Sequence, residues 1–94
     1  MQIPINIEVL KSVLAKTEDE ARQIIDQTKR VRINEGTLVD AKKPENQRII
    51  VEAPANPGDG LLIIDLINEH GAITTLVYDL KAKKFRQQEE EEEE

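Results

Sequence analysis

The sequence predicts a small α+β domain in which an N-terminal helical segment packs on a mainly antiparallel sheet of three to five strands. Two observations predict it. Apolar residues recur at helical spacing through the first third of the chain, and two β-rich runs between residues 61 and 80 flank a short turn, as in a central hairpin. The chain has 94 residues, enough for one domain. We expect that domain to occupy residues 1–86 and an acidic low-complexity tail to occupy 87–94.

The first element predicted is a helix over about residues 6–30, preceded by an extended segment. Apolar residues at gaps of three and four trace one stripe from Ile7 to Val31. Asn6 is placed to cap the start, and Thr17 begins a capping box at which the helix is expected to break. Residues 3–10 also alternate as in a strand, so strand and helix remain alternatives there.

The middle of the chain predicts short strands separated by turns. Glu35-Gly36 lies between two β-like runs, residues 41–47 form a polar stretch typical of a turn, and residues 48–53 are a strand candidate. Residues 54–60 hold two prolines and two glycines. Such a composition predicts a loop.

The predicted hairpin at 61–80 is apolar on both faces. Its turn is expected at Asn68–Gly71, and mirroring across that turn gives the pairs Leu66–Ile73, Ile64–Thr75 and Leu62–Val77 as one face. The opposite face supplies the candidate interaction residues, which are Leu61, Ile63, Asp65, Ile67, Leu76 and Tyr78. One helical segment covers one face, so we expect a second copy to cover the other, in a homodimer or higher oligomer. The alternative is a monomer in which the halves of a broken helix cover more surface.

The inventory of catalytic side chains is poor. The chain has no cysteine, one serine (Ser12, in a helical stretch) and one histidine (His70, in the hairpin turn), and it has no metal-ligating motif or phosphate-binding loop. We therefore expect a protein that is not an enzyme, with no catalytic residues, no cofactor and no metal. Asp65 is the one ionisable residue on its face of the hairpin, so we expect it either to pair with a lysine or arginine or to be functional.

The acidity of the chain belongs to its tail. The net charge is −6, but six of the 19 acidic residues are Glu89 to Glu94, which leaves 13 acidic and 13 basic residues in positions 1–88. The basic residues form three clusters: Lys29, Arg30 and Arg32; Lys42, Lys43 and Arg48; and Lys81, Lys83, Lys84 and Arg86.

These observations predict a small protein-interaction or regulatory domain that acts as a homo-oligomer through an apolar sheet face or edge. The alternative is a nucleic-acid-binding protein that uses Lys81, Lys83, Lys84 and Arg86 and is gated by the acidic tail. Nucleic acid ranks below the chain itself and another protein as a partner, because Tyr78 and Phe85 are the only aromatic residues available for base stacking. No apolar stretch or basic leader suggests a membrane, so we expect a cytoplasmic protein without a membrane partner.

Overall fold

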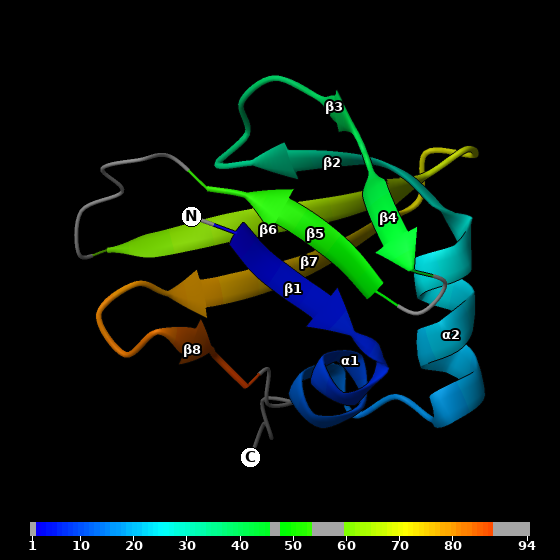
Figure 1. Ribbon diagram of the computed structural model, residues 1–94, viewed down its shortest axis with the longest axis horizontal. Helices are drawn as coiled ribbons and strands as arrows, with labels where there is room; N and C mark the ends of the chain where they lie inside the picture. Colours follow the sequence, from blue (N-terminus) through cyan, green and yellow to red (C-terminus); the bar gives the residue numbers. More distant parts are fainter. Residues whose placement is uncertain (1, 46–47, 54–59, 88–94) are drawn as a thin grey trace, which may run out of the picture.

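The computed structural model describes residues 2–45, 48–53 and 60–87. Over these residues it contains two helices and two antiparallel sheets, the α+β class that the sequence predicts (Figure 1). The helices are α1 (Ile7–Leu14) and α2 (Glu18–Gln27). The smaller sheet has the strand order β1 (Gln2–Asn6), β5 (Arg48–Glu52) and β4 (Lys42–Glu45). The larger sheet has the order β3 (Val39–Asp40), β2 (Thr28–Ile33), β6 (Leu61–Asn68), β7 (Ile73–Asp79) and β8 (Lys84–Phe85).

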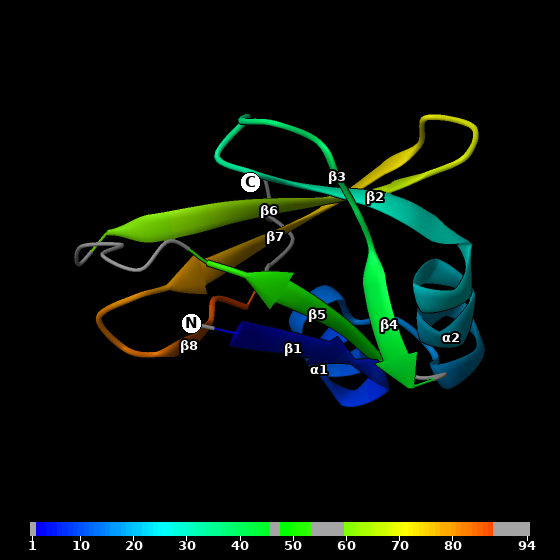
Figure 2. The ribbon, with the colours of Figure 1, turned by 45° about the horizontal axis from the view of Figure 1, so that its top comes forward.

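The two sheets form two layers, and the core lies between them. Figure 2 shows the three-stranded sheet and both helices on the same side of the five-stranded sheet. The smaller sheet contributes the buried residues Ile3, Ile5, Ile49 and Val51, and the larger contributes Val31, Leu62, Ile64, Leu66 and Leu76. No helix or strand among the described residues covers the opposite face of the five-stranded sheet.

The start of the chain resolves as a strand followed by a helix. Residues 2–6 form β1, and the Asn6 side chain caps α1 by accepting a hydrogen bond from the backbone N–H of Val9 at 2.9 Å. The helix ends at Leu14, and the next residue, Ala15, caps it with a left-handed φ of 55°. α2 then begins with the predicted capping box between Thr17 and Glu20. Neither of the two helices described is long and apolar enough to cross a membrane.

The prediction that the helix continues to residue 30 is wrong, because α2 ends at Gln27. Thr28 starts β2, and its hydroxyl donates to the carbonyl of Ile24 at 2.6 Å. Val31 belongs to the apolar stripe in the sequence, yet it reaches the core from a strand. β-Branched residues pack well on a pleated sheet, so Thr28 and Val31 fit this assignment.

The middle of the chain follows the prediction in part. The strand expected at 48–53 is β5, and Glu35-Gly36 lies in the turn that connects β2 with β3. The polar turn expected at 41–47 is wrong for Lys42–Glu45, which form β4. Residues 46–47, most of the expected loop at 54–60, and the glutamates of the tail lie outside the described residues.

The hairpin is confirmed, but its expected register is wrong by one residue. The backbone N–H of Asn68 bonds to the carbonyl of Ala72 at 3.1 Å, and Gly71 has a φ of 88°. The loop therefore holds three residues with a left-handed glycine at its end, as is common in hairpins. The observed pairs are Leu62–Tyr78, Ile64–Leu76, Leu66–Thr74 and Asp65–Thr75. The two faces of β7 are consequently exchanged relative to the mirrored pairing.

The capping box generates a test of how α2 is held. Thr17→Ala removes the hydroxyl that accepts from the N–H of Glu20 at 3.1 Å. We expect the free energy of unfolding to fall by about 1 kcal/mol, since a lost N-cap leaves an unsatisfied backbone donor. Urea unfolding monitored by circular dichroism measures the change. Thr17→Ser keeps the hydroxyl and should retain most of the stability; an equal loss in both variants would contradict the capping explanation.

Candidate interaction surface

The uncovered side of the five-stranded sheet, here called the outer face, is the surface that the fold leaves available. Strand alternation places the following side chains on it: Arg30, Arg32, Leu61, Ile63, Asp65, Ile67, Ile73, Thr75, Val77 and Asp79. Leu61, Ile63 and Ile73 are 44%, 41% and 52% exposed, and they are three of the five large apolar residues exposed in the described structure. Branched aliphatic side chains therefore dominate a surface that faces water.

An ion pair between a buried carboxylate and a partly exposed arginine crosses the centre of this face. The pairing of β2, β6 and β7 sets Arg32 opposite Asp65 and Asp65 opposite Thr75. Nε and Nη2 of Arg32 donate to one carboxylate oxygen of Asp65 at 3.0 and 2.8 Å, and the Thr75 hydroxyl donates to the other at 2.9 Å. Asp65 is 5% exposed although no helix or strand in the described part of the chain lies over it.

The burial of Asp65 follows from its neighbours. Ile63 and Ile67 flank it along β6, and the Arg32 side chain covers it from β2. A carboxylate removed from water in this way is costly unless hydrogen bonds satisfy it, and Asp65 has three of them. The pairing expected for Asp65 is therefore present, and its partner is Arg32.

Other charges on and beside the outer face are also paired within it. Arg30 lies 3.4 Å from the carboxylate of Asp40 on β3, and Arg86 lies 4.0 Å from Asp79. The backbone N–H of Ala82, foremost, holds the pKa of Asp79 below its ordinary value, and the N–H of Lys81 and the nearby Arg86 add to this. Each arginine on this face thus has a carboxylate beside it, and the face has little net charge.

The six candidate interaction residues divide between two faces. Leu61, Ile63, Asp65 and Ile67 lie on the outer face as a set. Leu76 and Tyr78 do not join them, because the observed register turns them toward the core, where Leu76 is fully buried. Tyr78 instead packs edge-on against Phe85 with ring centroids 5.0 Å apart.

The outer-face residues that sequence reasoning missed include Ile73, Val77, Thr75 and Arg32. The first three follow from the hairpin register, and the available signal was Gly71. A glycine at the end of a loop favours a left-handed residue there and hence a three-residue loop. Arg32 carried no comparable signal, because its partner Asp65 is 33 positions away.

The basic clusters do not form one surface. Lys81, Lys83, Lys84 and Arg86, the candidate nucleic-acid contacts, are exposed around β8, which is the opposite edge of the five-stranded sheet from β3. In the other two clusters, Arg30 and Arg32 bind carboxylates. Lys43 donates to the carbonyls of Ile25 and Asp26 at 3.1 Å, where a cation complements the C-terminal end of α2.

The two residues considered for catalysis lie apart from each other and from Asp65. His70 is exposed in the hairpin turn, with Nε2 3.6 Å from the carboxylate of Glu69. Ser12 is exposed on α1, and its hydroxyl lies 3.5 Å from the carbonyl of Val9. Within the described part of the chain, no three histidine, aspartate or glutamate side chains are grouped to hold a metal ion.

Comparison of the chain with protein-family models, curated proteins and solved structures gives no match. The interpretation of the outer face therefore rests on its own geometry: an aliphatic surface with an internally neutralised ion pair, whose carboxylate is buried, at its centre.

The ion pair generates a stability prediction. Asp65→Ala leaves the Arg32 guanidinium, whose side chain is 29% exposed, without its carboxylate, and we expect a loss of about 2 kcal/mol in the free energy of unfolding. The matched control is Asp40→Ala, which removes the carboxylate of an exposed pair with Arg30 and should cost less than about 0.5 kcal/mol. Chemical unfolding of both variants measures the difference, and similar losses would show that the central pair is not special.

Proposed function

We propose that this chain is a small non-enzymatic interaction domain that associates with a second copy of itself through the outer face. The observation that supports the proposal is the exposure of Leu61, Ile63 and Ile73 on one uncovered sheet face. Contiguous exposed apolar surface rimmed by polar groups commonly marks a protein-interaction site. A regulatory role would follow from association that depends on concentration.

Charge favours a second copy as the partner. On the outer face Arg32 pairs with Asp65, and Arg30 pairs with Asp40. These charges therefore need no opposite charge from a partner. Two such faces meet without like-charge repulsion at the contact, because every ion pair is completed before association. In the described part of the chain, the same face has no unpaired positive charge with which to bind a phosphate backbone or a strongly acidic partner.

The size of the face suggests a reversible dimer. Eight residues of β6 extend about 26 Å, and five strands span about 20–25 Å. That area, roughly 500–650 Å² in projection, is below the about 800 Å² that each partner of a stable complex typically buries. Packing through this face alone therefore suits a dissociation constant in the micromolar range rather than an obligate assembly.

A two-fold arrangement places the same residues of both copies in contact. In an isologous interface each residue meets either itself or a residue that meets it in return. The exposed aliphatic side chains Leu61, Ile63 and Ile73 would then meet across the contact around the central Arg32–Asp65 pair, and the Arg30–Asp40 and Arg86–Asp79 pairs would supply the rim.

Replacing an apolar side chain of the outer face with a charged one tests the proposal. Ile63→Lys puts an unpaired charge into the expected contact and should weaken self-association at least tenfold, because burying that charge is costly. Leu38→Lys is the matched control: Leu38 is 43% exposed, as Ile63 is 41% exposed, but it lies in the β2–β3 connection. Sedimentation equilibrium over a concentration series measures both. A monomer at all concentrations, or equal weakening by the two variants, would contradict the proposal.

Salt dependence separates self-association from the nucleic-acid alternative. Each chain has a net charge of −6, so two chains repel at long range, and raising the salt concentration should leave the dimer unchanged or strengthen it. Binding to a phosphate backbone through basic residues weakens steeply over the same series because counterions are released. Sedimentation for the protein alone and anisotropy with a labelled oligonucleotide give the two readouts. Dimer dissociation on adding salt would argue against an apolar contact.

A further inference from the structure

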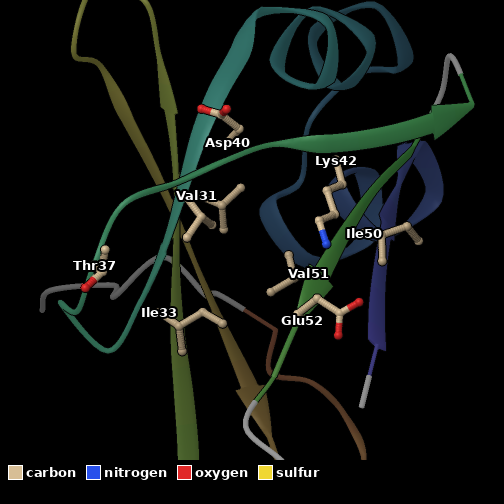
Figure 3. Close-up of a pocket in the computed structure, with 9 residues that line it drawn as sticks. Val31, Ile33, Thr37, Asp40, Lys42, Ile50, Val51 and Glu52 are labelled. Carbon is tan, nitrogen blue, oxygen red and sulfur yellow. The ribbon is translucent and has the colours of Figure 1, made fainter.

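The two sheets separate at one edge and leave a pocket of about 310 Å³ between them (Figure 3). The chain crosses from the five-stranded to the three-stranded sheet through the single residue Ala41, between the two-residue strand β3 and β4. The aliphatic residues that line the pocket are Val31, Ile33, Val39, Ile50 and Val51. The pocket is separate from the outer face, because Val31 and Ile33 lie on the core face of β2.

One wall of the pocket is an incomplete strand edge. Pro4 pairs with Ile50 across β1 and β5, and proline has no N–H, so Pro4–Ile50 is a non-hydrogen-bonded pair. The backbone groups of Ile50 therefore point to the other side, toward β4, where Ile50 pairs with Lys42. Glu52, two residues further, points its N–H and C=O the same way. β4 does not extend to it: the described pairing with β5 ends at Ile50.

The floor of the pocket is aliphatic, and its residues are already in place without an occupant. Val31 and Val51 are 3% and 2% exposed, so they are already fixed in the core. Val39, at 54% exposed, stands at the wall and would be covered by an occupant. A branched aliphatic side chain inserted here would exchange water contacts for contacts with three valines.

Lys42 is the one cationic side chain among the described residues that line the pocket, and two carboxylates, those of Asp40 and Glu52, share its rim. The Asp40 carboxylate lies 3.4 Å from Arg30, and the Glu52 side chain accepts a hydrogen bond from the Gln2 amide at 2.7 Å. Lys42 has no ion pair in the described part of the chain. Figure 3 shows its ammonium group directed toward Val51 and Glu52, with the Asp40 carboxylate turned away from it.

We propose that this pocket binds the C-terminal end of an extended peptide whose last residue is a branched aliphatic. The peptide backbone adds beside β5 at Glu52, where the edge lacks a partner strand. The last side chain fills the aliphatic floor over Val31 and Val51, and the terminal carboxylate pairs with Lys42. Main-chain pairing to a sheet edge combined with a side-chain pocket is a general mode of peptide recognition, and the Lys42 ammonium group selects a chain end over an internal segment.

Titration of the isotope-labelled protein with acetyl-Thr-Thr-Thr-Val, followed by amide chemical shifts, tests the proposal. We expect shifts at Val31, Val39 and Glu52, and about fivefold weaker binding when the peptide carries a C-terminal amide, as for a partly exposed charge pair. Lys42→Met should lower the affinity for the free acid to that of the amide and leave amide binding unchanged. The control is Lys84→Met, which changes an exposed lysine in β8 of the five-stranded sheet and should change neither affinity.

Four outcomes would overturn the proposal. Equal affinities for acid and amide would remove the role of Lys42. If Lys42→Met and Lys84→Met lowered the affinity for the free-acid peptide equally, the peptide would be bound by non-specific charge attraction and not by Lys42. Isobutyrate with the affinity of the peptide would show that the pocket takes small acids and that the strand edge contributes nothing. Chemical-shift changes confined to Ile63 and Ile73 would place the peptide on the outer face. The pocket proposal is independent of self-association, so a monomeric protein would leave it intact.

Discussion

The pairing of Asp65 with Thr75 sets the register on which both layers of this fold depend. In a strand, successive side chains point to opposite faces, so one pair fixes every other pair in the ladder. With Asp65 opposite Thr75, Ile64 and Leu76 face the smaller sheet together, both fully buried. A shift of one residue would put Thr75 into that core in place of Leu76. Alternation along β6 places the Asp65 carboxylate on the outer face, and the pairing of β2 with β6 brings Arg32 opposite it.

Much of the fold was predictable because its signals are local. The side chains of Asn6 and Thr17 cap the helices from positions within three residues of the groups they bond. The β-rich runs at 61–80 needed only a turn between them to predict a hairpin. The two-sided apolar character of that hairpin also indicated an uncovered face, which the outer face is. In each case the interaction partners are close in sequence, so composition and spacing were sufficient.

The remaining features depend on residues that are far apart in sequence. No signal in the sequence near residue 28 indicates that Thr28 and Val31 belong to a strand, because their strand conformation depends on pairing with β6. Arg32 looked like a member of a basic cluster at a helix end, and its role became visible only opposite Asp65. The register error had a nearer cause: Gly71 closes a three-residue loop, and counting four residues exchanged the faces of β7.

The placement of β1 has a consequence for how the chain is made. Gln2 and Glu52 hydrogen-bond across 50 positions, so β1 is synthesised on the order of several seconds before its partner β5 at typical synthesis rates. During that interval Ile3 and Ile5 lack their core, and an unpaired aliphatic strand invites pairing with another nascent chain. Pro4 interrupts the row of donors at the middle of β1 and makes it a poor template. Pro4 thus sets which way the backbone groups of Ile50 point in the finished protein and also protects β1 during translation.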